Sequence, residues 1–263
     1  MLELKKGHKL INFENEIKKI GKKIYSWQKN KKNKQIINIK KFKLLADSKA
    51  DILIKKSIKK FFGQSIILSE ENKINKFSKS FWLIDPIDGT RSFYNNFKGY
   101  VLQVAYIFRG KPIYSIIYAP ALNKTWTASL NSGSYLNGKK IVSNKKMREK
   151  IRIIDNYPLP TGIAKIIKNK IKNSKYLECG SIGLKAAMVS DDSADIFIKD
   201  IKFKDWDIMP ALLLNHEVGN TVCDLEGKEI TISKGLKKNK GLIVCKKGLK
   251  YKILRMIKNA KKK

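Results

Sequence analysis

The spacing of apolar residues over the first 62 positions predicts two amphipathic helices. The first spans residues 10–27, where an apolar residue recurs every three or four positions with lysines between, the spacing of one helical face. This narrow stripe favours a helix packed on a core over a helix lying on a membrane surface. The second is expected from Ser48 to Phe62, with Asp47 or Ser48 near its N-cap and Gly63 just past its end.

Short runs rich in β-branched and aromatic residues follow, and they predict strands joined as an antiparallel meander. The segment 109–112 and the pair Asn137-Gly138 have the composition of hairpin turns. The predicted strands cover residues 65–68, 80–84, 101–108, 113–118 and 125–129.

Beyond Ser143 the pattern changes to alternating strands and helices, which is typical of an α/β arrangement. The expected strands are 151–154, 176–179, 195–198, 221–224 and 242–245, and the expected helices are 162–172, 182–190, 207–217 and 249–260. We therefore expect an α+β half at 1–143 followed by an α/β half at 144–263. No low-complexity linker separates the halves, so we expect them to pack as one structural unit.

Composition supports a folded chain. With 43% hydrophobic and 10% aromatic residues among 263, the chain has enough apolar surface to bury a core and is not disordered. No apolar run approaches the roughly 18 residues of a membrane span, and the first six residues lack the apolar segment of a secretory signal. The three separated cysteines indicate reduced core residues in a cytoplasm.

The formal net charge of +35 raises the question of a polyanion partner, either nucleic acid or an anionic membrane surface. However, the lysines are spread along the whole chain, arginine is scarce, and lysine accompanies isoleucine and asparagine, the other residues with A/T-rich codons. The main interpretation is therefore a solvated, compositional surface charge, and RNA or anionic-surface binding remains the alternative.

Acidic residues are rare here, so the places where they gather are informative. They do so at 69–71, 82–90 and 205–208. His8 and His216 are too few and too far apart for a histidine-based metal cluster, so a bound metal would be held by oxygen.

The segment from Asp85 to Thr90 has the chemistry of a phosphoryl-transfer site. Pro86 ends a strand, so the carboxylates of Asp85 and Asp88 and the carbonyl of Ile87 can face one space, as hard oxygen ligands suited to Mg²⁺. Gly89 allows close backbone approach, and the following amides can bind an anion. The alternative is a proline turn whose aspartates cap local backbone.

The other two segments strengthen the metal interpretation. Glu70 follows an apolar strand and Asp207 opens a predicted helix, so both can be held beside the turn. Carboxylates brought together without counter-charge repel each other, so their convergence implies bound cations. The alternatives are an exposed loop acid for Glu70, a helix N-cap for Asp207, and plain surface charge for Glu71 and Asp205.

Together these residues resemble the inositol monophosphatase superfamily of Mg²⁺-dependent, lithium-sensitive phosphatases. The resemblance rests on Glu70, on Asp85-Pro86-Ile87-Asp88-Gly89-Thr90 after Trp82, on Trp206-Asp207, and on Glu217-Val218-Gly219, in that order. It implies the layered αβαβα sandwich of that superfamily, of the type shared with fructose-1,6-bisphosphatase.

The resemblance also implies roles. Glu70, Asp85 and the Ile87 carbonyl match ligands of a first Mg²⁺, and Asp85, Asp88 and Asp207 match ligands of a second. The metal ions activate a water for in-line attack on phosphorus and steady the leaving oxygen. Asp47, Thr90 and Glu70 surround that water, near a third and weaker ion, and the amides of Gly89 and Thr90 match those that bind phosphate.

Within the superfamily the chain resembles bacterial 3'(2'),5'-bisphosphate nucleotidases, which convert adenosine 3',5'-bisphosphate to AMP. The resemblance lies in the segments 68–71, 110–112, 117–120 and 180–185. It implies that Ser181 and Lys185 meet a second phosphate or the ribose; the alternative for Lys185 is a solvated lysine. Asp200 lies where inositol phosphatases carry a glutamate that contacts inositol hydroxyls, so an inositol or other sugar phosphate remains an alternative substrate.

Departures from the family pattern weaken the assignment to a subfamily more than they weaken the assignment of the reaction. Asn220 replaces a glycine of the Glu-Ala-Gly-Gly segment, and His216 precedes Glu217. We expect a phosphomonoester hydrolase acting on a small phosphorylated substrate, with a basic RNA-binding or anionic-surface-binding protein as the non-enzyme alternative. A homo-oligomer is compatible with the sequence, which does not predict the oligomeric state.

Overall fold

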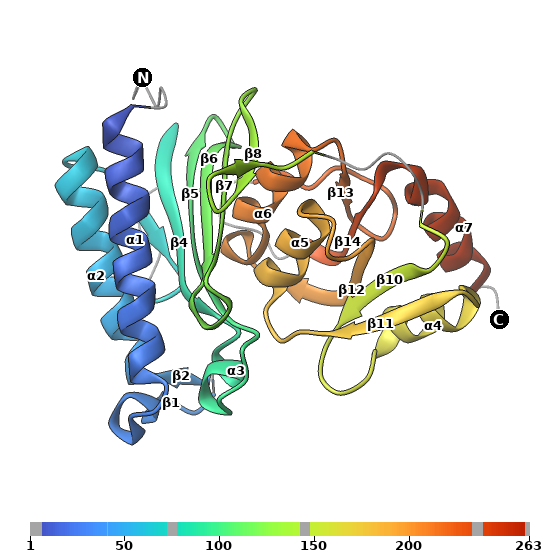
Figure 1. The fold of residues 1–263 in the computed structure, drawn as a ribbon, viewed down its shortest axis with the longest axis horizontal. Coiled ribbons are helices and arrows are strands. Elements are labelled where there is room, and N and C mark those ends of the chain that lie inside the picture. The colour runs from blue at the N-terminus through green and yellow to red at the C-terminus, as the bar shows by residue number, and fades with distance from the viewer. Residues whose placement is uncertain (1–6, 41, 73–77, 143–147, 233–238, 261–263) are drawn as a thin grey trace.

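The computed structural model describes residues 7–40, 42–72, 78–142, 148–232 and 239–260. Helices and sheets alternate in five layers across the molecule (Figure 1), which confirms the predicted αβαβα sandwich. The expected boundary at 143/144 and the first six residues lie outside the described residues. Among the helices of the described ranges, none is long and apolar enough to cross a membrane.

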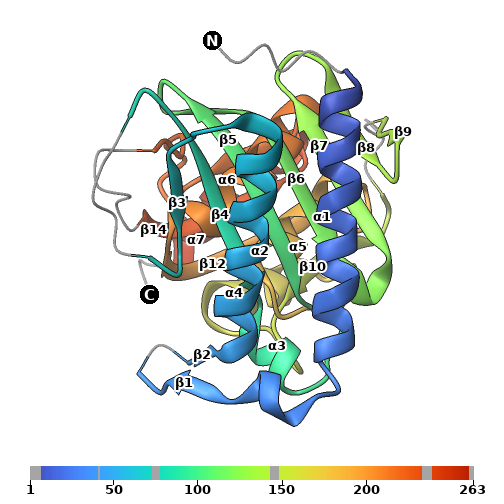
Figure 2. The same cartoon turned by 90° about the vertical axis from the view of Figure 1, so that its left-hand side faces the viewer.

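Helices α1 (His8–Trp27) and α2 (Leu45–Phe62) form the first layer and cover the outer face of a sheet (Figure 2). The predicted stripe is the buried face of α1: Phe13 and Ile17 pack with Ile54 of α2 and with Trp82 and Tyr114 of the sheet. Burying such side chains stabilises the layer by about 1.5–3 kcal/mol each. Between the two helices lie a short 3₁₀ turn (Lys31–Lys34) and the hairpin β1 (Ile36–Asn38) and β2 (Lys43–Leu44), none of which the apolar pattern predicts.

The second layer is a seven-stranded sheet in the order β3-β4-β5-β6-β7-β8-β9. Its strands are β3 (Ile67–Ser69), β4 (Ser80–Asp88), β5 (Val101–Phe108), β6 (Lys111–Ala119), β7 (Lys124–Ser129), β8 (Gly133–Leu136) and β9 (Lys139–Lys140). From β4 onward the strands form the predicted antiparallel meander, whereas β3 pairs parallel to β4. The prediction of a wholly antiparallel meander was wrong at this edge, because the apolar pattern does not encode strand direction.

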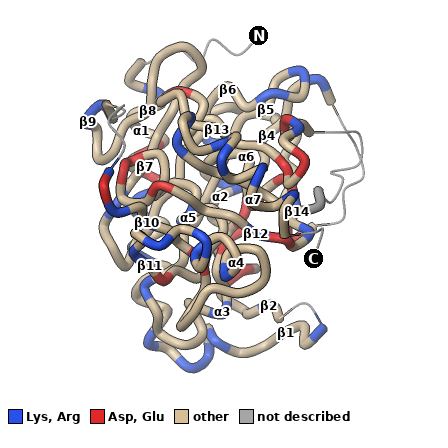
Figure 3. Tube along the Cα trace, turned by 90° about the vertical axis from the view of Figure 1, so that its right-hand side faces the viewer, with Lys and Arg blue, Asp and Glu red and all other residues tan. Residues whose placement is uncertain are grey.

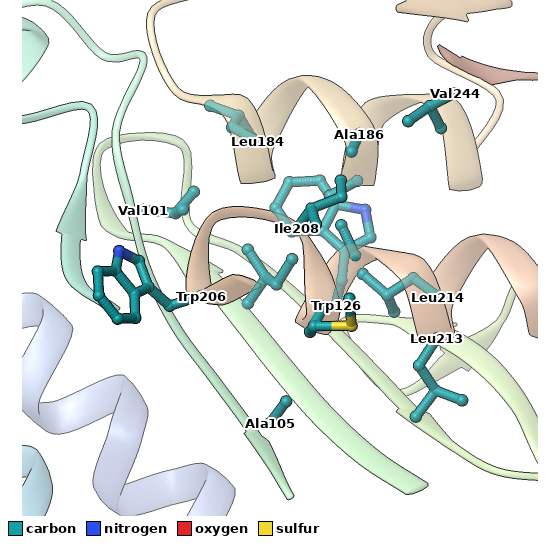
Figure 4. Close-up of a cluster of buried hydrophobic side chains, with 14 of the residues drawn as sticks. Val101, Ala105, Trp126, Leu184, Ala186, Trp206, Ile208, Leu213, Leu214 and Val244 are labelled. Atoms are coloured by element: carbon teal, nitrogen blue, oxygen red, sulfur yellow. The ribbon is translucent and has the colours of Figure 1, made fainter. Parts of the chain in front are cut away.

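Helices α5 (Ile182–Ser190) and α6 (Asp205–Glu217) form the middle layer. They are enclosed by both sheets, so α5 is apolar nearly all round. Figure 4 shows part of this core, where Trp126 of β7, Leu184 and Ala186 of α5, and Ile208 of α6 lie together. The same cluster includes Val244 of the second sheet, so one apolar core runs through both halves of the chain.

The fourth layer is a five-stranded sheet in the order β11-β10-β12-β14-β13. Its strands are β10 (Ile151–Asp155), β11 (Ser174–Glu178), β12 (Ile196–Phe203), β13 (Thr221–Cys223) and β14 (Asn239–Cys245). β10 is parallel to β11 and β12, whereas β14 is antiparallel to β12 and β13, so the sheet is mixed. Helices α4 (Gly162–Lys170) and α7 (Lys250–Ala260), the latter preceded by a 3₁₀ turn (Lys247–Leu249), cover its outer face.

The remaining elements are the short helix α3 (Thr90–Tyr94), which follows β4 after Gly89, and a 3₁₀ turn (Pro120–Leu122) after β6. The prediction that Pro86 ends the strand was wrong, because β4 continues to Asp88 and accommodates the proline at a register irregularity between Asp85 and Asp88. The three cysteines are buried and unbridged. Their burial agrees with the core role expected from the sequence.

Candidate active site

Glu70 and Asp85 lie side by side because β3 and β4 run parallel. Ser69 is the register partner of Ile84, so Glu70, the residue that follows β3, comes next to Asp85, which is still paired with Gln103 of β5. The Glu70 amide donates to the Ile84 carbonyl at 3.3 Å, which continues the ladder by one residue. Parallel strands present their carboxyl ends together, and two carboxylates are thereby brought to one point.

Asp88 connects β4 with the N-terminus of α5. Its Oδ2 accepts hydrogen bonds from the Ser181 hydroxyl at 2.5 Å and from the Gly183 amide at 2.6 Å, and Oδ1 accepts from the Ile182 amide at 3.4 Å. Helix N-termini favour such anions. Ser181 is also the N-cap of α5, since its Oγ accepts from the Leu184 amide at 2.9 Å.

Gly89 turns the chain from β4 into α3 with φ at +92°. A Cβ at this position would lie 2.7 Å from the Gly99 carbonyl oxygen and 3.2 Å from Cβ of Ser181. Only glycine fits both the left-handed conformation and the space.

Asp47 and Thr90 meet across the site. Thr90 Oγ1 lies 3.2 Å from Asp47 Oδ1 and 3.0 Å from the Ile87 carbonyl oxygen. Asp47 Oδ2 accepts from the Leu44 amide at 2.9 Å, which fixes the carboxylate in the first turn of α2. The sequence placed Asp47 at or near the N-cap, and the structure places it three residues inside the helix.

Asp207 occupies the same helical position in α6. Its Oδ2 accepts from the Lys204 amide at 2.7 Å. The helix begins at Asp205, two residues before the predicted start. Asp207 therefore stabilises the helix terminus, the structural role considered from the sequence, while its carboxylate lies near Asp88 and Glu70.

Burial and mutual proximity make these acids hard to ionise together. Burial raises the pKa of Asp47 to about 7, and repulsion from Glu71 and Glu70 adds to the rise. Burial raises the pKa of Glu70, with repulsion from Asp88 and Glu71 adding to the rise and a side-chain hydrogen bond with Asp85 opposing it. Burial raises the pKa of Asp85, and repulsion from Glu70 and Asp88 adds to the rise. The pKa values of Asp88 and Asp207 rise chiefly through burial, and for Asp88 this outweighs the hydrogen bonds from α5.

Asp85 provides a specific test of whether the residues fit a cation. The carboxylate is 1% exposed, and its Oδ1 accepts from no amide, hydroxyl or ammonium group within the part of the chain that the structure describes. A buried carboxylate oxygen with no such donor is costly unless a cation binds it. Among the described residues no three acidic, histidine or cysteine side chains already form a finished coordination group. The oxygen-only chemistry of the set suits Mg²⁺.

Gln103 is a site residue that the sequence interpretation missed. It is completely buried in β5, and its Nε2 lies 3.4 Å from Asp85 Oδ2, 3.5 Å from Asp88 Oδ2 and 3.4 Å from the Asp207 carbonyl. It therefore links the two strand acids to the start of α6. The sequence did contain a signal for Gln103, because it is an amide side chain inside the otherwise apolar strand predicted at 101–108.

Lys185 lies close enough to Asp88 to favour its charged form, whereas Asp200 has no recorded interaction with the clustered acids in the described part of the chain. Lys185 is 1% exposed, and its Nζ donates to Asn156 Oδ1 at 2.7 Å, so the solvated-lysine alternative is wrong. Burial lowers its pKa. Asp200 is exposed and accepts from the Ile163 amide of α4 at 3.2 Å. Contact of either residue with substrate stays a prediction.

The two acids left as surface charges are buried. Asp205 is fully buried, and burial raises its pKa to about 7. The Glu71 side chain is 8% exposed and pairs with Lys43 Nζ at 2.9 Å. The surface-charge interpretation was therefore wrong for both, because sequence alone does not show which lysine covers an acid.

The comparisons with known proteins agree with this geometry. The model of the Inositol monophosphatase family matches residues 9–262. A fructose-1,6-bisphosphatase/inositol-1-monophosphatase of Thermotoga maritima is 33% identical over 201 residues, covering 75% of this chain and 77% of that protein. A Nus factor SuhB of Xylella fastidiosa is 29% identical over 198 residues, covering 70% of this chain and 69% of that one.

A 3'(2'),5'-bisphosphate nucleotidase CysQ of Aggregatibacter actinomycetemcomitans is 29% identical over 178 residues, covering 64% of this chain and 66% of that one. Among solved structures, an IMPase of Thermotoga maritima superposes with a TM-score of 0.80 at 26% identity, covering 95% of this chain and 96% of the other.

Proposed function

Because the chain belongs to the inositol monophosphatase family, we propose that it is a Mg²⁺-dependent, lithium-sensitive phosphomonoester hydrolase that uses two metal ions. The observation that carries the proposal is the convergence of Glu70, Asp85, Asp88 and Asp207, with Asp85 Oδ1 buried and accepting from no amide, hydroxyl or ammonium group among the described residues. The buried, unbridged cysteines support a reducing cytoplasmic location.

In the proposed reaction the chain positions substrate and moves one proton. The amides of Gly89 and Thr90 hold the phosphate. Thr90, 3.2 Å from Asp47, accepts the proton of the attacking water and passes its own to the Asp47 carboxylate, which acts as the general base. Bound Mg²⁺ supplies Lewis-acid activation of that water and charge stabilisation at the leaving oxygen. Glu70, Asp85, Asp88, Asp207 and the Ile87 carbonyl are the proposed ligands.

For the substrate we propose adenosine 3',5'-bisphosphate, which loses its 3'-phosphate to give AMP. Support comes from the nucleotidase-like segments of the sequence and from a relative that carries that name. The burial of Lys185 weakens its proposed contact with a second phosphate. The alternative is an inositol or sugar phosphate, in line with the relative from Thermotoga maritima.

A side-by-side assay tests this proposal. Phosphate release with Mg²⁺ is measured from adenosine 3',5'-bisphosphate, inositol 1-phosphate and fructose 1,6-bisphosphate. The proposal expects the highest kcat/KM for the bisphosphonucleotide. A higher kcat/KM for either sugar phosphate overturns the substrate assignment. No phosphate release from any of the three compounds overturns the proposed phosphatase activity.

Polyanion binding is a second candidate, favoured by one surface feature. A groove of about 650 Å³ between α1 and α2 is lined by Lys18, Lys19, Lys22, Lys60 and Phe61, among other residues. Lysines beside an aromatic ring suit a flexible nucleic acid strand, and a relative with 29% identity is named Nus factor SuhB. Replacing the four lysines with glutamine should weaken RNA binding and flatten its salt dependence. Unchanged binding would remove this candidate.

A further inference from the structure

Lys43 lies at one end of the acid cluster and is held there by two contacts. Its Nζ pairs with Glu71 Oε1 at 2.9 Å and donates to the Glu70 carbonyl at 3.3 Å. The Lys43 side chain is 14% exposed and that of Glu71 is 8% exposed, so the ion pair is largely shielded from water. Such pairs are screened far less than surface pairs.

The chain on either side of Lys43 is fixed. The preceding residue, Phe42, packs edge-on against Tyr94 with ring centroids 5.5 Å apart, and the Arg91 guanidinium lies 4.6 Å from the centre of the Phe42 ring. The following residue, Leu44, donates its amide to Asp47. Lys43 therefore belongs to a segment anchored on α3 and on α2, and its ammonium has a defined position.

Glu71 is held by more than Lys43. Its Oε2 accepts from Ser48 Oγ at 3.2 Å, and its amide donates to Ser69 Oγ at 3.2 Å. Repulsion from the Glu71 carboxylate raises the pKa of both Asp47 and Glu70, the two acids at this end of the cluster. Among the described residues, Lys43 is the positive charge recorded in contact with the Glu71 carboxylate.

We propose that Lys43 is a positioning residue that keeps Glu71 from binding metal, so that the chain binds one divalent cation fewer than its acids could hold. The Lys43 ammonium takes the place of a divalent metal ion beside Glu70 and Glu71. It also binds the Glu70 carbonyl, while the Glu70 amide is bound by the Ile84 carbonyl, so the Glu70 backbone is held on both sides. This inference rests on the proposed metal-dependent function.

Counting Mn²⁺ bound per chain by equilibrium dialysis tests the inference without an activity assay. Lys43→Met is expected to bind one more Mn²⁺ per chain than the wild type, because Glu71 becomes available. The double variant Lys43→Met/Glu71→Gln is expected to return to the wild-type number. A Lys43→Met protein that binds the wild-type number overturns the inference.

Two matched variants separate this effect from simple loss of a buried ion pair. Lys55 pairs with Asp51 at 2.5 Å on α2, with a side chain 19% exposed, and has no recorded contact with Glu70 or Glu71. Lys55→Met is expected to keep the wild-type Mn²⁺ number, and an extra ion there contradicts the inference.

Glu71→Gln alone keeps Lys43 and is also expected to bind the wild-type number. Fewer ions in this variant would show that Glu71 is a metal ligand and overturn the inference, even if Lys43→Met does not fold. A wild-type protein that binds no Mn²⁺ at all contradicts the proposed function itself, so the two failures are distinguishable.

Discussion

Ser181 Oγ lies 2.5 Å from Asp88 Oδ2, although 93 positions separate the two residues in the chain. This hydrogen bond joins the end of β4 to the start of α5. One carboxylate thus belongs both to the acid cluster and to the capping of a helix from the other half of the chain. Changes at this contact are expected to affect metal binding and stability to different extents.

Asp88→Asn should abolish hydrolysis while leaving the fold intact. The amide keeps the shape of the side chain and one acceptor for the α5 amides, but it removes a negative charge from the cluster. We expect kcat/KM to fall by about 100-fold or more, with circular dichroism unchanged. Asp224→Asn is the control, since Asp224 accepts from the backbone of its own turn. Near-wild-type turnover in Asp88→Asn would refute the ligand assignment.

Ser181→Ala should have two separable effects. Loss of the N-cap costs about 1 kcal/mol of unfolding free energy, and loss of the bond to Asp88 should weaken Mg²⁺ binding by about tenfold. Chemical denaturation and calorimetric titration measure the two. Ser190→Ala is the matched control, because Ser190 lies at the other end of α5 and bonds only the Ala187 carbonyl among the recorded contacts. Equal Mg²⁺ affinities of the two variants would argue against a positioning role for Ser181.

The stability of the metal-free protein should fall as pH rises from about 4 to about 7. The pKa of Asp47 is raised from 3.8 to about 7, chiefly by burial. In this window the folded state holds a proton that the unfolded state has lost, so raising the pH favours unfolding. Each unit of pKa difference is worth about 1.4 kcal/mol, and the raised pKa values of Glu70 and Asp85 act in the same direction.

Saturating Mg²⁺ should flatten this dependence, because it neutralises the ionised acids. Denaturant titrations across the pH range, with EDTA and with Mg²⁺, give the comparison. Stability that increases with pH in EDTA, or a slope that Mg²⁺ does not change, would contradict the electrostatic picture of the site.

Salt should slow the capture of a doubly phosphorylated substrate. Figure 3 shows Lys and Arg positions on many separate segments of the Cα trace, in keeping with the net charge of +35. A positive field of this kind speeds the arrival of anions and is screened by salt. Between about 0.05 and about 0.5 M KCl we expect kcat/KM to fall several-fold for a bisphosphate and less for a monophosphate. Equal salt effects on both would remove the steering role.

Much of this architecture was predictable from local patterns. Phe13 and Ile17 show the helical period that buries α1, and α5 has the predicted bounds of Ile182 and Ser190. The candidate acids were found because carboxylates are rare in this chain and because proline and glycine flank Asp85 and Asp88. In each case the signal lies within a few residues of sequence.

What could not be predicted depends on contacts between distant residues. The parallel pairing of β3 with β4 sets the closeness of Glu70 and Asp85, and strand direction leaves no mark on an apolar run. The burial of Lys185 against Asn156 and the pairing of Lys43 with Glu71 select individual lysines from a chain full of them. Because lysine is so common in this chain, the composition predicts that each of these lysines is solvent-exposed.

The most direct test of the central claim is Mg²⁺-dependent phosphate release by the purified protein and by its Asp85→Asn variant. The proposed function predicts that the wild type releases phosphate from a small phosphomonoester with Mg²⁺ and stops in EDTA, and that Asp85→Asn is inactive under both conditions while remaining folded. Release that persists undiminished in EDTA, or that is equal in wild type and Asp85→Asn, would contradict it.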